Sequence, residues 1–235
     1  MASFMHSISS RFRHTHTPAA NLYNPTELPE FTKGTVGLIM EENGAPDTPY
    51  RNWSILFVGG ILNTEDDVFT NAERLKEMTD KAVIPFWNNV HATHKQDRQR
   101  MEDVIEQLSP IIEELVQRGK LCIIAHSHGA LLVSNTLQSL KDRDILDETR
   151  KANLEVYTYG GVTTVAKDLA GVVLNYRNHD DTTQVIGTIK WHKKNDTQWI
   201  SLQGPGSGHQ LIGGYDTHAA QTIRDFTFRS ENTLS

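Results

Sequence analysis

Short apolar runs of strand length alternate with amphipathic stretches of helix length from Trp53 onward, and this alternation constrains the fold more than any other feature. SILFV (54–58) is continuously apolar and ends in Gly59-Gly60, as is typical of a strand buried on both faces. Further strand candidates are AVIPFW (82–87), residues 120–125, LEVYTYGGV (154–162) and VVLNY (172–176). Strands that alternate with helices are joined by right-handed crossovers. The chain therefore predicts an α/β fold with a mostly parallel central sheet and helices on both faces.

The segments between these strands carry apolar residues at helical spacing. The longest stripe runs from Met101 to Val116 and contains Pro110, so either the helix kinks there or Ser109 caps a new helix. A final helix is expected to start near Tyr215. Further strand candidates are TVGLIM, TIKW and TQWISL, and residues 141–151 are a candidate for a small helical lid. The connection from 162 to 172 is too short for a large cap domain.

Length and composition predict one domain of a soluble globular protein, since 37% of the 235 residues are apolar and 22% are charged. The formal charge is 23 − 29 = −6, so nucleic acid is not an expected partner. A single cysteine, Cys122, excludes a disulfide framework and a cysteine-rich metal site.

The N-terminal part differs from the rest in that it has no acidic residue before Glu27. We expect residues 1–33 to form a flexible or surface-packed arm before a domain spanning 34–235. No apolar run reaches the roughly 20 residues of a membrane helix, so no integral membrane segment is predicted. Arg11 and Arg13, with no acidic residue before Glu27, leave an organelle-targeting sequence as an alternative to a cytoplasmic location.

Three polar segments follow strands and are expected to meet at one edge of the sheet: GGILN, AHSHG and NHDD. Ligand sites in parallel α/β sheets lie beyond the carboxyl ends of the strands. The agreement of the three segments favours a site at this edge.

The segment AHSHG (125–129) lies between an apolar strand and a helical stripe, where a nucleophilic serine would be presented on a tight turn. Such a turn requires small residues two positions before and two positions after the nucleophile. Ala125 and Gly129 meet this requirement, although Ala125 replaces the usual glycine. Ser127 is therefore the candidate nucleophile, and the alternative is an ordinary serine in a buried turn.

A serine nucleophile requires a base, and in this type of fold the order along the chain is serine, acid, histidine. Six of the eleven histidines precede Ser127, and His128 is too close to fold back onto it. His209, in the glycine-rich loop GPGSGHQLIGG, is the preferred base, with His218 in the final helix as the alternative. No metal is predicted, because His91 and His94 have no carboxylate or cysteine partner at ligand spacing.

The acid is expected where the strand 172–176 ends, because NHDD places Asp180 and Asp181 side by side there. One carboxylate can hold the imidazole while its neighbour points away. Asp181 is preferred from the spacing of the turn that starts at Asn178, and Asp180 stays open.

These motifs resemble those of the α/β-hydrolase superfamily of serine hydrolases, in the lipase/esterase-like branch. The elbow is similar to small-His-Ser-x-Gly, FVGGILNT (57–64) is similar to the loop after the third strand, and YTYGGV (157–162) is similar to a strand end in lipases. The likeness covers roughly residues 53–229 and implies the α/β-hydrolase fold with little or no cap. It also implies that the backbone N–H groups of Ile61 and His128 form an oxyanion hole. Gly59 departs from the His or Asn that is usual in this loop.

The resemblance implies an esterase that cleaves a small-molecule ester with Ser127, His209 and Asp181 as a catalytic triad and needs no cofactor. An acyltransferase with the same triad is one alternative. A catalytically silent binding module on the same fold is the other, because a fold does not determine a function.

Overall fold

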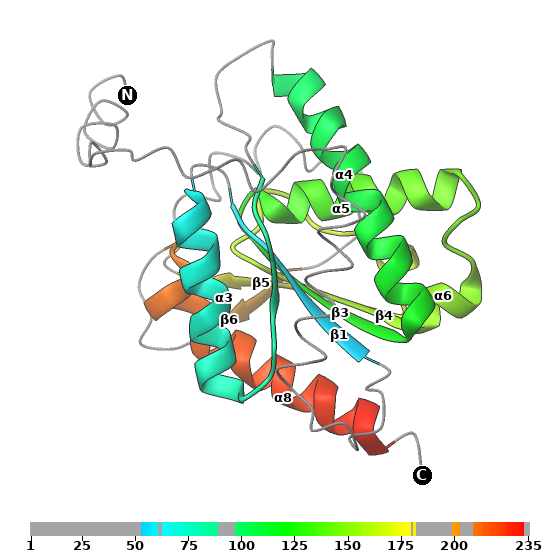
Figure 1. Cartoon of the computed structure of the whole chain (residues 1–235). Coiled ribbons are helices and arrows are strands. Elements are labelled where there is room, and N and C mark those ends of the chain that lie inside the picture. Colours follow the sequence, from blue (N-terminus) through cyan, green and yellow to red (C-terminus); the bar gives the residue numbers. More distant parts are fainter. Residues whose placement is uncertain are drawn as a thin grey trace.

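The computed structural model describes residues 53–60, 63–88, 97–179, 181, 199–202 and 209–232 (Figure 1). Six strands occur in these ranges: β1 (Trp53–Val58), β2 (Ile84–Phe86), β3 (Lys120–His126), β4 (Leu154–Tyr159), β5 (Val172–Asn178) and β6 (Trp199–Leu202). The helices are α3 (Glu65–Thr79), α4 (Asp97–Arg118), α5 (Gly129–Asp142), α6 (Glu148–Ala152) and α8 (Asp216–Asn232). Two short segments, η1 (Lys167–Leu169) and η2 (Leu211–Tyr215), complete the elements.

The strands form one sheet in the order β2-β1-β3-β4-β5-β6, and every neighbouring pair is parallel. The register aligns Val58 of β1 with Ala125 of β3, and Ala125 with Thr158 of β4. The carboxyl ends of β1, β3 and β4 therefore lie side by side. The prediction of a mostly parallel central sheet is confirmed.

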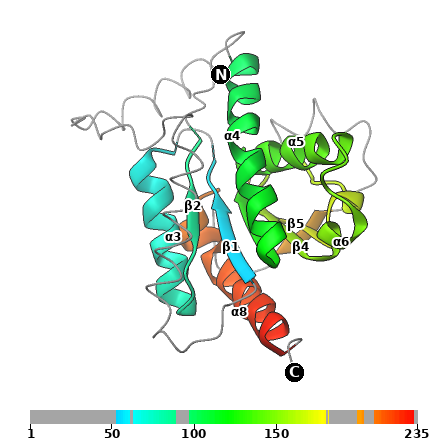
Figure 2. The same cartoon turned by 45° about the vertical axis from the view of Figure 1, so that its right-hand side comes forward.

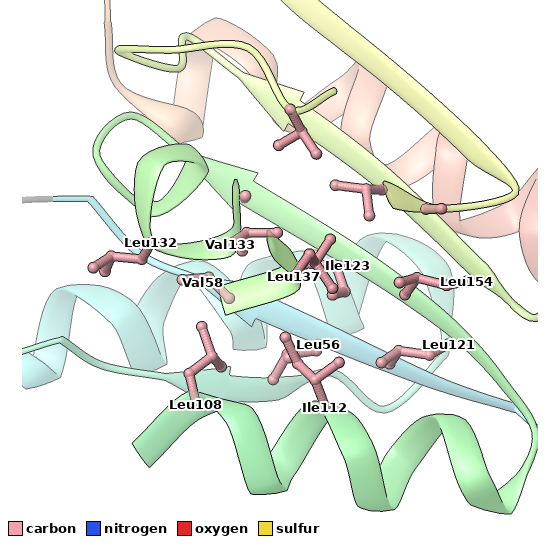
Figure 3. Close-up of a cluster of buried hydrophobic side chains, with 14 of the residues drawn as sticks. Leu56, Val58, Leu108, Ile112, Leu121, Ile123, Leu132, Val133, Leu137 and Leu154 are labelled. Carbon is pink, nitrogen blue, oxygen red and sulfur yellow. The ribbon is translucent and has the colours of Figure 1, made fainter. Parts of the chain in front are cut away.

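Helices cover both faces of the sheet, which confirms the predicted layers (Figures 1 and 2). On one face, Leu108 and Ile112 of α4 and Leu137 of α5 pack in one apolar cluster with Leu56 and Ile123 (Figure 3). On the other face, the side chains of α3 and α8 pack against Ile55, Phe57 and Ile124. Full burial of each such side chain is worth roughly 1.5–3 kcal/mol, so the two clusters hold the sheet between the helices.

Local signals determine where helix α3 begins and ends. The Thr64 hydroxyl accepts from the N–H of Asp67, and the Asp67 carboxylate accepts from the N–H of Thr64, which is a capping box. At the other end, Asp80 has a left-handed backbone and its N–H donates to the carbonyl of Lys76. The helix therefore begins directly after the loop that follows β1.

Helix α4 continues through Pro110 as one helix, so the alternative in which Ser109 caps a new helix is wrong. The Ser109 hydroxyl instead donates to the carbonyl of Ile105, 2.7 Å away, one turn earlier. Proline removes only one intrahelical donor, and the buried apolar face of α4 offsets that loss.

The prediction that residues 141–151 form a small helical lid is also wrong. This segment contains the end of α5 and the short helix α6, which directly precedes β4 and contacts its amino end through Lys151 and Gly171. It therefore lies at the sheet edge opposite to the carboxyl ends of the strands (Figure 1).

Several expected features lie outside the described residues: the arm 1–33 and the strands TVGLIM and TIKW. The strand expected in TQWISL is present as β6. Within the described ranges, no helix combines the length and the apolar character that a membrane span requires.

Candidate active site

Ser127 occupies the sharp turn between β3 and α5 and has a left-handed backbone, with φ of 55°. Of the non-glycine residues in the described ranges, only Asp80, Ser127 and Asp144 have positive φ. Hydrogen bonds hold the turn: the Ser127 N–H donates to the Tyr159 carbonyl at 3.0 Å, and the Ser127 carbonyl accepts from the Val162 N–H at 3.2 Å. A strained backbone that its surroundings hold in place is frequent at functional sites.

The residues two positions before and after Ser127 are small for steric reasons. A Cβ atom on Gly129 would lie 2.4 Å from the carbonyl oxygen of Val58 and 2.8 Å from that of Gly59. Ala125 is fully buried between Val58 and Thr158 of the neighbouring strands, where a methyl group fits. Helix α5 can therefore begin against the end of β1 only if position 129 has no side chain.

The structure brings His209 and Asp181 to Ser127, although 82 residues separate His209 from the serine. Ser127 Oγ lies 2.6 Å from His209 Nε2, and His209 Nδ1 lies 2.9 Å from Asp181 Oδ2. The Asp181 side chain is fully buried, whereas the His209 side chain is 28% exposed. A carboxylate can only accept, so Nδ1 of His209 carries the proton and Nε2 can accept from the Ser127 hydroxyl.

Asp181 Oδ2 accepts a second hydrogen bond, from the hydroxyl of Tyr215 at 2.8 Å. The Tyr215 hydroxyl in turn accepts from the backbone N–H of Asn178 at 2.9 Å. The strand-end turn expected here is present, because the Asp181 N–H donates to the Asn178 carbonyl at 3.2 Å. The acid thus lies in a turn that Tyr215 ties to the last helix.

His126 holds the main chain of His209, a contact that no pattern in the sequence predicts. Its Nε2 donates to the His209 carbonyl oxygen at 2.6 Å, and its ring lies 5.2 Å from the His209 ring between centroids. Burial, and then the charge of His209, lower the pKa of His126 to about 4. His126 is therefore neutral at pH 7 with its proton on Nε2.

The loop after β1 is braced by the residues that follow β2. The Trp87 indole N–H donates to the Asn63 carbonyl at 3.0 Å, and Asn88 Nδ2 donates to the Gly59 carbonyl at 2.7 Å. Inside the loop, the Gly60 N–H donates to Asn63 Oδ1 at 2.7 Å. Trp87 and Asn88 thus hold this loop in place.

The other residues considered for the site lie in different places. His128 follows Ser127 and occupies the N-cap position of α5 without a side-chain cap hydrogen bond. Ile61 and Asp180 lie outside the described residues, as do His91 and His94. His218, the alternative base, contacts Tyr159 and Tyr176 on the face that α8 covers. Across the described ranges, no three His, Cys, Asp or Glu side chains gather in a metal-binding arrangement.

A parallel sheet between two helical layers, with a strained serine where β3 enters α5, is the arrangement of the α/β-hydrolase fold. Comparison with solved structures agrees. An esterase of Pyrobaculum calidifontis superposes with a TM-score of 0.52 at 11% identity, over 97% of this chain and 98% of that one. The chain therefore has the α/β-hydrolase fold, which confirms the expected fold and the resemblance at the level of the fold.

Two further structures are similar at lower scores. They are an esterase/lipase from an uncultured bacterium (TM-score 0.49, 11% identity, 97% of each chain) and dienelactone hydrolase from Anabaena variabilis (TM-score 0.48, 15% identity, 77% and 88%). No protein-family model and no curated protein sequence matches the chain.

Proposed function

We propose that this chain is a serine hydrolase that cleaves carboxylic esters of small molecules through an acyl-enzyme. One observation carries the proposal: Ser127, on a strained turn, lies 2.6 Å from a histidine whose other ring nitrogen lies 2.9 Å from a fully buried carboxylate. A nucleophile, a base and an orienting acid in hydrogen-bond contact are the requirement for acyl transfer.

In the first step, His209 Nε2 takes the hydroxyl proton while Ser127 Oγ forms a bond to the carbonyl carbon of the ester. The Asp181 carboxylate stabilises the imidazolium that results and holds its orientation. The imidazolium then returns the proton to the departing alcohol as the C–O bond breaks. Water repeats the sequence on the acyl-enzyme, which releases the carboxylic acid and restores Ser127.

Backbone N–H groups are needed to bind the oxyanion of the tetrahedral intermediate. Those of Gly59 and Gly60 already donate, to the Phe86 carbonyl at 3.3 Å and to Asn63 Oδ1 at 2.7 Å. The proposed donors are those that the resemblance implies, Ile61 next in the same loop and His128 at the start of α5. The positive end of the α5 helix dipole adds to the stabilisation.

The test uses Ser127→Ala and short p-nitrophenyl esters. We expect kcat/KM to fall by about 10³-fold or more, because the nucleophile is lost while the rest of the site stays. Ser109→Ala is the matched control, since Ser109 is also buried and hydrogen-bonded but lies on α4. Hydrolysis by Ser127→Ala at the level of the control would refute the proposal.

Two further measurements separate the alternatives. Labelling of Ser127 by a fluorophosphonate supports an activated nucleophile, and an unlabelled folded protein would favour a binding module without catalysis. Product analysis with added alcohols or amines distinguishes a hydrolase from an acyltransferase, since an acyltransferase would form the new ester or amide in preference to the acid.

A further inference from the structure

Tyr215 is buried directly behind the Ser127–His209–Asp181 arrangement, and its side chain is almost completely inaccessible, at 1% exposure. It ends η2, six residues after His209, and precedes the first residue of α8. Its hydroxyl takes part in two hydrogen bonds, with Asp181 Oδ2 at 2.8 Å and with the Asn178 N–H at 2.9 Å.

The direction of each hydrogen bond follows from the groups involved. A backbone N–H can only donate, so the Tyr215 oxygen accepts from Asn178. The carboxylate of Asp181 can only accept, so the Tyr215 proton points to Oδ2. Burial, assisted by the hydrogen bond to Asp181, raises the pKa of this hydroxyl, which keeps its proton in place at neutral pH.

His209 and Tyr215 donate to the same oxygen of Asp181, so each affects the other's bond. A carboxylate oxygen that accepts a second donor holds less charge for the first. The same hydroxyl also limits rotation of the carboxylate about its Cβ–Cγ bond.

We infer that Tyr215 is a positioning residue of the proposed hydrolase: through Asp181 Oδ2 it orients the acid and sets how strongly the acid stabilises the His209 imidazolium. The inference rests on the proposed function of Ser127 and adds a fourth member to its hydrogen-bonded chain. The hydrogen-bonded chain then runs from Ser127 Oγ through His209, Asp181 and Tyr215 to the backbone of Asn178, so the turn after β5 and the segment that leads into α8 both hold the base in place.

The variant Tyr215→Phe keeps the ring and removes the hydroxyl. We expect kcat to fall by roughly 5- to 20-fold with KM nearly unchanged, since the carboxylate that orients His209 is no longer held by the hydroxyl and the change lies away from the substrate. The acid limb of the kcat/KM profile should move to higher pH by roughly half a unit to one unit, because the carboxylate then stabilises the imidazolium more strongly. A purely structural tyrosine would lower activity without moving this limb.

Tyr157→Phe is the matched control. Tyr157, on β4, is also a buried tyrosine, and its hydroxyl also donates to a carboxylate, that of Glu155, at 2.5 Å. This variant should leave the pH profile in place. An equal shift in both variants would overturn the inference.

A double-mutant comparison tests whether Tyr215 acts through Asp181. In an Asp181→Asn background, Tyr215→Phe should lower kcat by less than about 2-fold, because the carboxylate that it orients is gone. A full additional loss in that background would overturn the inference. Loss of activity in Ser127→Ala together with an unmoved acid limb in Tyr215→Phe would refute the role of Tyr215 alone, whereas an active Ser127→Ala would refute the proposed function.

Replacing Tyr215 by 3-fluorotyrosine provides a second probe that does not remove the hydroxyl and so preserves the fold. The fluorinated hydroxyl is more acidic and a stronger donor, so the acid limb should move in the opposite direction, to lower pH. A limb that stays in place, or moves to higher pH, would overturn the inference.

Discussion

Gly160 lies directly after β4 with φ of +58°, and its replacement by alanine should disturb the candidate site without removing any of its polar groups. A Cβ atom at position 160 would lie 3.1 Å from Asp181 Oδ2, 3.1 Å from Tyr215 Cε2 and 3.2 Å from His209 Nδ1. The substitution Gly160→Ala therefore inserts a methyl group against Asp181, His209 and Tyr215 at once.

The loss of stability in Gly160→Ala has two parts, backbone strain and crowding, and a substitution at Gly213 allows them to be separated. Gly213 also has a left-handed backbone, with φ of +79°, but a Cβ atom there would meet nothing within 4 Å. Gly213→Ala should thus cost only the backbone strain, about 1–2 kcal/mol. Gly160→Ala should cost the same strain plus about 1–2 kcal/mol of crowding. The crowded groups must shift by a few tenths of an ångström, which we expect to lower kcat by roughly 10- to 100-fold.

Urea denaturation at neutral pH measures the two stability losses, and hydrolysis of a short p-nitrophenyl ester measures kcat. Gly213→Ala should keep nearly all of its activity per folded molecule. Equal activity of the two variants, after correction for the folded fraction, would refute the argument that the contacts at position 160 control the geometry of the base.

Three further predictions concern the elbow. Gly129→Ala should destabilise the protein by about 3 kcal/mol or more, or prevent folding, because the new Cβ would meet the backbone oxygen of Val58 at 2.4 Å; thermal melting measures this. Ala125→Gly should cost about 1 kcal/mol in urea denaturation and leave kcat within about 2-fold, since a buried strand loses a methyl group and the nucleophile keeps its turn. The pKa of His126, about 4 when folded against 6.5 ordinarily, means that the unfolded chain takes up the proton first as the pH falls. The free energy of unfolding is thus unaffected by this histidine above pH 6.5 and falls by about 3 kcal/mol as the pH drops toward 4. Urea denaturation of His126→Gln should lack this part of the pH dependence.

The strand runs and the elbow could be predicted because their signals are local. A strand buried on both faces needs a short continuous apolar run, and Ser54 to Val58 supplies one within a few residues. The serine turn needs small neighbours at fixed positions, and the sequence shows both around Ser127. The choice of His209 and Asp181 also depended on chain order, a rule that holds for the fold rather than for the local sequence.

Tyr215 and His126 could not be predicted in the same way, because their contacts join segments that are distant in the sequence. Thirty-four positions separate Tyr215 from Asp181, and 83 separate His126 from the carbonyl of His209. In the sequence, Tyr215 looks like any aromatic residue of a core, and His126 looks like any histidine next to a turn. The wrong prediction of a lid has a related cause. The charged side chains of residues 141–151 indicate that the segment is exposed, but they do not indicate at which end of the strands it lies.

The pair Gly59-Gly60, which departs from the usual loop, has a steric explanation that links it to the nucleophile. A Cβ atom on Gly59 would lie 2.5 Å from Cγ2 of Val68 in α3, so a side chain there would push the helix from the sheet. A Cβ atom on Gly60 would lie 2.8 Å from Cβ of Ser127 and 3.2 Å from Asn63 Oδ1. The loop after β1 therefore passes in contact with the serine itself, and a side chain at position 60 would displace the atom that carries the hydroxyl. Because Asn63, Trp87 and Asn88 brace the loop in this place, the two glycines let its backbone approach the site where a larger residue would exclude it.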